Sequence, residues 1–195
     1  MTEIRELVAA ERTDLVEVLS GLTAEEWDQP SLCTGWRVRE VVAHITMAYR
    51  YSMPRVLFGI AKSGGFNRFS ERAARADTAA LSNAELLSCL RDNIHHPWQP
   101  PGGGYEGALS HDVIHGLDMT VALGIDRRVP LDRLRVVLDG LGPKHLKYFG
   151  VDLSGIELRA TDLDWSYGAG EVVTGTAQDF VGLVSGRESS VRRGS

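Results

Sequence analysis

Residues 110–118 read Ser-His-Asp-Val-Ile-His-Gly-Leu-Asp and place two histidines four positions apart in a segment with helical periodicity. On an α-helix, residues i and i+4 lie on one face with their Cβ atoms about 5–6 Å apart. Two imidazoles held in this way, His111 and His115, can bind one metal ion. The best third ligand is His44, because it interrupts the apolar stretch 41–45 of another predicted helix. Four-helix bundles build metal sites from such inward side chains on facing helices.

The composition is typical of a folded domain and excludes two classes of function. The 195 residues include 43% hydrophobic residues and carry a net charge of −5. A nucleic-acid-binding domain would normally present a basic face, and no apolar run approaches the ~20 residues that span a bilayer. Two cysteines are too few for a disulfide scaffold, and the polar N-terminus lacks the apolar core of a signal peptide. We therefore expect a cytoplasmic protein that binds neither nucleic acid nor membrane.

Four amphipathic segments predict the helices of the bundle. Apolar residues recur at helical spacing in these segments, which is typical of helices that bury one face. The segments are 2–20, about 36–57, 83–94 and about 105–123. In the first segment we expect the charged residues to lie opposite the apolar stripe. Residues 62–70 contain two adjacent glycines and are interpreted as a loop.

The last third of the chain has a different pattern. After a helix over about 130–141, residues 156–160 alternate between apolar and polar side chains, which predicts a strand. Residues 165–174 are interpreted as a β-hairpin. A capping box at 176–179 then opens a last helix.

These patterns predict a mostly α fold, a four-helix bundle with a small C-terminal α+β appendage made of a β-hairpin and a helix. We place the metal-binding bundle at residues 1–128, the appendage at 129–188 and a disordered tail at 189–195. A homodimer is compatible with such a bundle, although no sequence feature requires one.

The three histidines have two interpretations. In the first they are core residues that hydrogen-bond to neighbouring groups and hold no metal. In the second they bind an ion, and three protein ligands leave a coordination position open, as in a catalytic zinc site. The apolar surroundings of His44 favour the second, because a buried imidazole needs partners for its nitrogens. Cys33 precedes a helix, where a thiolate would be favoured, but an inert packing cysteine is the more frequent outcome.

Three stretches together resemble one known family. Residues 33–44, Cys-Thr-Gly-Trp-Arg-Val-Arg-Glu-Val-Val-Ala-His, are similar to its Cys-x-Gly-Trp entry into a helix that carries a metal-binding histidine. Residues 111–118 are similar to its paired-ligand segment with a following aspartate, and 160–165 followed by Gly186–Arg187 to its C-terminal region. The chain thus resembles the DinB/YfiT-like superfamily of metal-binding bundles and, more narrowly, the mycothiol-dependent maleylpyruvate isomerase family.

The resemblance implies a divalent metal, usually zinc with nickel or iron as alternatives, held by His44, His111 and His115. It also implies mycothiol as a thiol cosubstrate whose sulfur takes the open metal position and, as a thiolate, attacks a small electrophilic substrate. The product is a thioether, as in an S-transferase, or a cis–trans isomer if the sulfur later leaves. Asp118 matches an acidic position that orients a ligand or substrate group, and Arg187 would bind a substrate or thiol carboxylate.

One departure from the family pattern keeps other functions open. The isomerase pattern has glutamate at the position of His111, whereas the three-histidine members of the wider superfamily have histidine there. This difference weakens the expectation of the isomerase reaction more than the expectation of a metal site. A metal hydrolase using a zinc-bound water is one alternative, with Asp112 or Asp118 as the nearby base. A non-catalytic DinB-like binding or stress-response module is the other. The substrate, the metal and the choice among these reactions are not predicted by the sequence.

Overall fold

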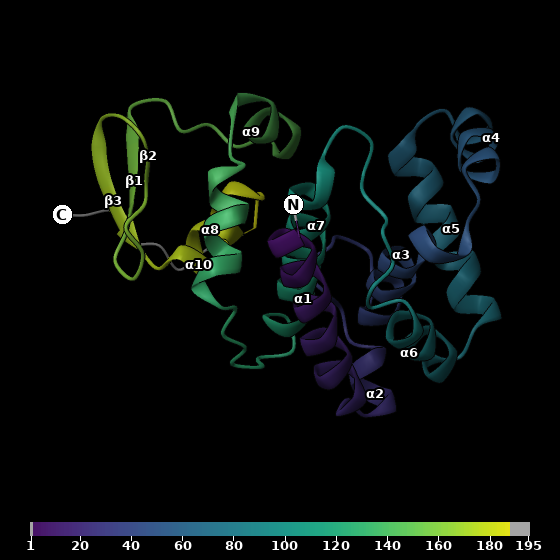
Figure 1. The fold of residues 1–195 in the computed structure, drawn as a ribbon. Helices are drawn as coiled ribbons and strands as arrows, with labels where there is room; N and C mark the ends of the chain where they lie inside the picture. Colours follow the sequence, from purple (N-terminus) through teal and green to yellow (C-terminus); the bar gives the residue numbers. More distant parts are fainter. Residues whose placement is uncertain (1, 188–195) are drawn as a thin grey trace.

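Capping residues divide the first 120 residues of the computed structural model, which describes residues 2–187, into seven helices. Thr23 and Ser82 each accept a hydrogen bond from the backbone three residues later, where a glutamate accepts from the cap in return. Such a capping box pairs two N–H groups that a helix start leaves without partners. The helices (Figure 1) are α1 (Thr2–Ser20), α2 (Ala24–Trp27), α3 (Val38–Arg50), α4 (Met53–Ser63), α5 (Phe66–Ala80), α6 (Asn83–Asp92) and α7 (Gly104–Thr120).

The predicted four-helix bundle is confirmed and consists of α1, α3, α6 and α7. Helix α1 packs against α6 and α7, and α3 packs against the same two helices. Apolar residues of these helices, including Leu15, Val41, Leu86 and Leu90, form one fully buried cluster. Because α3 and α7 are neighbours in this bundle, inward side chains of the two helices meet.

The prediction for residues 36–70 is wrong in two respects. The second helix does not continue to residue 57, because α3 ends at Arg50 and Pro54 lies in the first turn of α4, where a proline costs no helical hydrogen bond. The expected loop over 62–70 is almost entirely helical, and only Gly64 and Gly65 separate α4 from α5. Both have positive φ, 72° and 144°, which glycine adopts readily. The two helices therefore form a hairpin that packs against α3.

The expectation that all charges of the first helix face away from its apolar stripe is also wrong. Glu11 and Arg12 are fully buried, because α1 is covered by the bundle on one side and by C-terminal elements on another. Glu11 accepts hydrogen bonds from Arg127 at 2.7 Å and from Arg133 at 2.8 Å. Two guanidinium groups thus neutralise one buried carboxylate, and they link α1 to residues 127–133.

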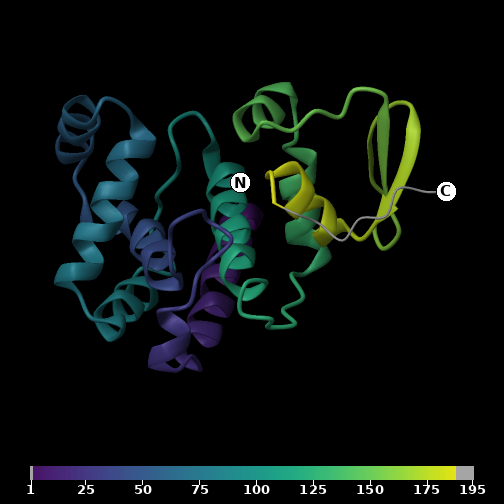
Figure 2. The ribbon, with the colours of Figure 1, turned by 180° about the vertical axis from the view of Figure 1, so that it is seen from behind.

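The C-terminal region contains three helices and a small sheet. Its elements are α8 (Leu131–Asp139), α9 (Pro143–Phe149), β1 (Ile156–Ala160), β2 (Ser166–Gly168), β3 (Glu171–Gly175) and α10 (Ala177–Val184). Helices α8 and α10 pack on α7, so one buried apolar cluster joins Leu109 and Val113 to Leu138 and Phe180. Figure 2 shows the sheet at the far end of this region, away from the bundle.

The predicted strand at 156–160 and the predicted last helix are present, but the predicted hairpin over 165–174 is wrong. The strand order is β2-β1-β3, with β1 antiparallel to β2 and parallel to β3. Residues 165–174 are therefore not a hairpin, and β1 and β2 form it instead. Gly168 and Gly170, with φ of 91° and 132°, carry the chain past β1 to its other edge, where the N–H of Glu171 donates to the carbonyl of Gly155.

Two expectations about the ends of the chain are not decided. The division of the chain at residue 128 stays a prediction, since α7 and α8 share the buried cluster described above. The predicted tail at 189–195 lies outside the described residues. Within residues 2–187, each helix is too short or too polar to cross a bilayer.

Candidate metal centre

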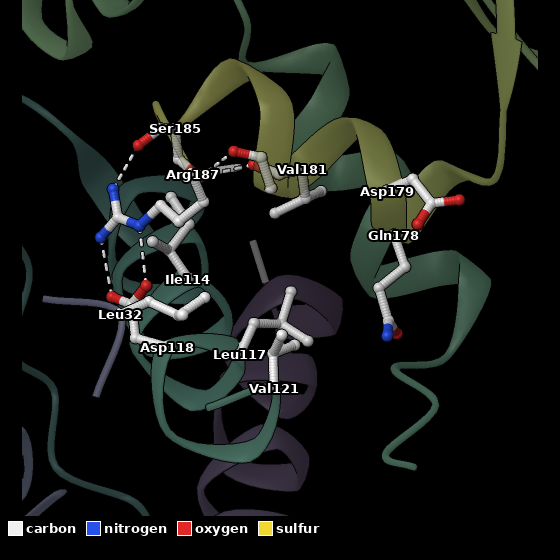
Figure 3. Close-up of a pocket in the computed structure, with 11 residues that line it drawn as sticks. Leu32, Ile114, Leu117, Asp118, Val121, Gln178, Asp179, Val181, Ser185 and Arg187 are labelled. Carbon is white, nitrogen blue, oxygen red and sulfur yellow. Dashed lines mark hydrogen bonds and ion pairs between the residues drawn. The ribbon is translucent and has the colours of Figure 1, made fainter. Parts of the chain in front are cut away.

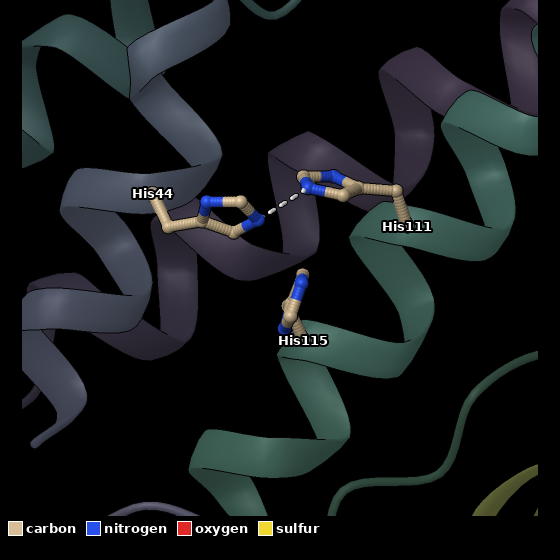
Figure 4. Close-up of side chains that lie close together, drawn as sticks. All are labelled: His44, His111 and His115. Atoms are coloured by element: carbon tan, nitrogen blue, oxygen red, sulfur yellow. Dashed lines mark hydrogen bonds between the residues drawn. The ribbon is translucent and has the colours of Figure 1, made fainter. Parts of the chain in front are cut away.

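The structure brings the three predicted histidines together (Figure 4). His44 projects from the middle of α3, and His111 and His115 project from successive turns of α7. Each offers a ring nitrogen, and these three nitrogens lie within 4.8 Å of one another. The Nε2 atoms of His44 and His111 are 3.2 Å apart. Two nitrogens bound to one tetrahedral zinc at 2.0–2.1 Å would lie about 3.3 Å apart, so this separation fits a shared ion.

The other nitrogen of each ring is fixed by a hydrogen bond. The partners are Ser70 Oγ for Nδ1 of His44 at 2.8 Å, Asp112 Oδ1 for His111 at 2.9 Å and Asp118 Oδ2 for His115 at 3.0 Å. Metal-binding histidines almost always have such a partner, which sets the tautomer and the ring orientation. The arrangement leaves Nε2 of each ring available to bind an ion.

Burial keeps two of the imidazoles in the neutral form that binds metal. Burial and the neighbouring histidines hold the pKa of His44 well below its usual value. Burial also lowers the pKa of His115, and the hydrogen bond to Asp118 offsets only part of that effect. A neutral imidazole has a free lone pair, so these rings need lose no proton before binding an ion near pH 7.

A buried arginine that the sequence analysis missed supports His111 through Asp112. Nε of Arg12 donates to Oδ2 of Asp112 at 2.8 Å, and its Nη1 donates to the carbonyls of Ile94 and His96. The signal was present in the sequence, because Arg12 follows Val8 by four residues and precedes Leu15 by three, which is the apolar face of α1. Ser70 gave no comparable signal, since its contact with His44 depends on how α5 packs on α3.

Asp118 and Arg187, the two predicted catalytic residues, pair with each other. Nε and Nη2 of Arg187 donate to the two oxygens of Asp118, both at 2.7 Å, and Nη1 donates to the carbonyl of Ser185. Burial alone would raise the pKa of Asp118, but hydrogen bonds from His115 and Arg187 outweigh it and hold that pKa well below its usual range. The carboxylate is therefore ionised and already holds the guanidinium in a bidentate pair.

Cys33 belongs to the same cluster as a thiol and not as the thiolate that its helix-start position would favour. Its Sγ donates to Oδ2 of Asp118 at 3.0 Å and lies 3.7 Å from Nδ1 of His115. Burial, followed by the negative charge of Asp118, raises the pKa of Cys33 to about 12. Cys33 therefore contributes a hydrogen bond to Asp118, on the side of His115 that faces away from the shared Nε2 position.

Two features surround this centre. The indole rings of Trp36 and Trp98 lie 5.2 Å, centroid to centroid, from His44 and His111 respectively. Trp36 and Trp98 thus border the centre. A cavity of about 290 Å³ lies between α7 and α10. Figure 3 shows the apolar side chains that line it, from Leu117 and Val121 on one side to Val181 on the other, with the Asp118–Arg187 pair beside them.

Comparisons with known proteins give one family match and two related sequences. Residues 8–96 match the family model of the mycothiol maleylpyruvate isomerase N-terminal domain. Two uncharacterized proteins of Mycobacterium tuberculosis, from strains CDC 1551 / Oshkosh and H37Rv, are each 27% identical over 219 positions, which cover 92% of this chain and 83% of theirs.

The crystal structure of a mycothiol-dependent maleylpyruvate isomerase has the same fold. It superposes with a TM-score of 0.58 at 15% identity and covers 97% of this chain and 90% of that one. A histidine-to-alanine mutant of a mycothiol-dependent maleylpyruvate isomerase gives the same TM-score at 16% identity. The likeness extends through the C-terminal region, which the family model does not reach.

Proposed function

Since residues 8–96 match the family model of the mycothiol maleylpyruvate isomerase N-terminal domain, we propose that the protein is a metal-dependent thiol S-transferase or isomerase. In this proposal His44, His111 and His115 hold a divalent metal, zinc before nickel or iron, and mycothiol is the thiol. The observation that carries the proposal is the anchoring of all three Nδ1 atoms, which leaves three Nε2 atoms facing one position.

Three protein ligands would leave part of the coordination sphere open for a thiol. A divalent ion there supplies a Lewis acid that lowers the pKa of a bound thiol, so that the nucleophile is a thiolate at neutral pH. The protein's own contribution is positional. Asp118 orients His115, Arg187 keeps Asp118 in place, and the rings of Trp36 and Trp98 restrict water beside the centre.

This assignment makes Arg187 a positioning residue. The sequence analysis assigned it to a substrate or thiol carboxylate, but both of the nitrogens that would form that bidentate contact donate to Asp118. A small electrophile with an apolar part fits the adjoining cavity better than a dicarboxylate would, because the cavity is lined mainly by aliphatic side chains.

The hydrolase alternative is weaker, because it needs a carboxylate free to act as a base toward a water molecule. Asp112 is held by Arg12 and by His111, and Asp118 by Arg187 and by His115. Both carboxylates therefore serve as hydrogen-bond partners of ligand rings. A non-catalytic module is also disfavoured, since such a module would be free to lose ligands and this chain has retained three.

Metal content tests the first half of the proposal. The protein is purified without a histidine tag and its metals are measured by mass spectrometry, beside His44→Ala and His115→Ala. We expect near-stoichiometric divalent metal in the wild type and its loss in both variants. His145→Ala, which changes a histidine of α9 outside the trio, is the matched control and should keep the metal. A wild type that stays metal-free after reconstitution with zinc, nickel and iron would contradict the proposal.

Thiol dependence tests the second half. The metal-loaded protein is incubated with mycothiol and a panel of electrophiles, and products are identified by mass spectrometry. A product heavier by one thiol indicates transfer, and a product of unchanged mass with altered double-bond geometry indicates isomerisation. Glutathione in place of mycothiol reports on thiol selectivity. Turnover without any thiol would instead favour the hydrolase.

A further inference from the structure

The outer face of α4 is apolar and has no partner among residues 2–187. Met53, Leu57 and Phe58 are 58%, 61% and 71% exposed, and α4 has no buried residue. At 3.6 residues per turn these three side chains lie within about 140° of one another around the helix axis. Val56 and Ile60 each lie about 160° around the helix from Phe58, and they pack against the cluster around Phe69. Large exposed apolar patches usually mark interaction sites.

The same segment is basic, although the protein as a whole is acidic. Residues 41–70 contain no aspartate or glutamate and four basic residues, while the full chain carries a net charge of −5. Three of the basic side chains, Arg55, Lys62 and Arg68, are exposed. Arg55 and Lys62 border the apolar face on one side, because they lie about 60° and 40° beyond Phe58 on the helix. The patch therefore combines an apolar centre with a cationic edge.

The position of α4 makes this face accessible to an extended surface. In Figures 1 and 2, α4 lies at the end of the ribbon opposite the sheet, outside the four helices of the bundle. Its inner face is fixed by close packing on α5, where a Cβ atom on Gly59 would lie 2.3 Å from the ring of Phe69. The helix is thus a rigid projection, and its exposed side chains are not free to fold back onto the bundle.

We propose that the outer face of α4 docks on an anionic membrane surface. Helices that lie in the interface of a bilayer combine Phe and Leu on one face with Lys and Arg on the flanks, which is the composition found here. A second copy of the chain fits less well, because pairing two α4 faces would bring six exposed cations together with no acidic residue from 41–70 to compensate them. The earlier expectation of no membrane partner rested on the lack of a spanning segment, which peripheral binding does not need.

Vesicle flotation tests the proposal on the full-length protein. Vesicles of phosphatidylcholine with added phosphatidylserine should carry the wild type to the top of a density gradient, and vesicles of phosphatidylcholine alone should carry much less. Leu57→Ser/Phe58→Ser should weaken binding at least about tenfold. Arg55→Gln/Lys62→Gln should weaken it about 25-fold, at about fivefold per charge. Raising the salt from about 0.1 M to about 0.5 M should also release the protein.

Two control variants distinguish binding through this surface from nonspecific adsorption of the protein to vesicles. Tyr148→Ser removes another exposed aromatic side chain, 68% exposed on α9, and Arg128→Gln removes an exposed cation near α8. Both should bind vesicles as the wild type does. All variants keep the basic residues at 192–193, so losses caused by α4 changes cannot come from the tail. Circular dichroism checks that each variant is folded.

Three results would overturn the proposal. One is equal flotation with charged and uncharged vesicles, and a second is flotation that survives both α4 double substitutions. The third is a dimer in analytical ultracentrifugation that Leu57→Ser/Phe58→Ser converts to a monomer, because the patch would then be an interface between copies.

Discussion

The two histidines of α7 are held by the same order of contacts, arginine to carboxylate to imidazole, but in different surroundings. The inner triad is Arg12, Asp112 and His111, and the outer triad is Arg187, Asp118 and His115. The arginine of the inner triad is 0% exposed and comes from the bundle itself, whereas that of the outer triad is 16% exposed and follows α10. The inner histidine is therefore fixed by the bundle core, whereas the outer one depends on the C-terminal region.

The largest effect is expected from breaking the inner triad. Arg12→Ala leaves Asp112 as a buried charge without its cation, which typically costs about 3–5 kcal/mol of unfolding free energy. Urea unfolding of the metal-free protein measures the change. Adding Asp112→Asn to this variant should recover part of the loss, because the buried group is then neutral. A loss below about 1 kcal/mol would mean that water reaches Asp112 and that the inner triad is not closed.

Removing the carboxylate of the outer triad should act on the metal. Asp118→Asn cannot accept the hydrogen bond from His115 with the strength of a carboxylate, and loss of such a partner typically lowers metal affinity about 10–100-fold. Competition with a chelator of known affinity measures this for zinc. Asp162→Asn, a carboxylate change outside both triads, should leave the affinity unchanged. Equal affinities for wild type and Asp118→Asn would show that His115 is oriented by packing alone.

A smaller effect on stability is expected at Arg187. Arg187→Ala should cost about 1–2 kcal/mol, less than Arg12→Ala, because Arg187 is partly exposed and water can replace it. Arg187→Lys should keep the charge but lose the bidentate geometry. We therefore expect lysine to restore stability more fully than metal affinity. If Arg187→Ala cost as much as Arg12→Ala in the same urea experiment, the contrast between the triads would be lost.

The smallest effect is expected at Glu40, which pairs with Arg37 at the start of α3 and provides a reference without histidine. Burial alone would raise the pKa of Glu40, but hydrogen bonds from Arg37 and Thr78 outweigh it and lower the pKa. A lowered folded-state pKa gives stability that is present above the unfolded value of about 4.3 and is lost as the pH falls below it. Glu40→Gln should therefore cost about 1 kcal/mol at pH 7.

That difference between wild type and Glu40→Gln should shrink when unfolding is followed by circular dichroism from about pH 6 to about pH 3. Metal content at pH 7 should not change, since Glu40 contacts none of the three histidines. A gap that stayed constant over this range would assign the loss to packing and not to charge.

Local patterns predicted the parts of the fold that depend on near neighbours. The spacing of His111 and His115 is a property of one helix, and the apolar stretch around His44 identified a second inward-facing turn. The capping box at 176–179 marked the start of α10 correctly because the box is formed within four residues. The family resemblance, confirmed by the match over residues 8–96, added the expectation that these segments meet.

Local patterns could not predict contacts between segments that are distant in the sequence. Arg187 and Asp118 are 69 residues apart, so nothing local indicated that their side chains would bind each other. The strand pairing of β3 was predicted wrongly because a glycine-bearing turn between two short strands favours a hairpin. In the structure β1 lies between β2 and β3 and pairs with both. The prediction of a loop at 62–70 was wrong because it gave two glycines more weight than the helical periodicity on either side.

The buried carboxylate of Glu11 has a consequence for how this protein could change during evolution. Of its two cations, Arg127 lies just before α8 and Arg133 lies within α8, in the C-terminal region. A bundle that exchanged this region for an unrelated one would have an unneutralised charge inside its first helix. The C-terminal region can therefore diverge in its strands and loops, but replacing it requires a simultaneous change at position 11. Positions 11, 127 and 133 are therefore expected to change together.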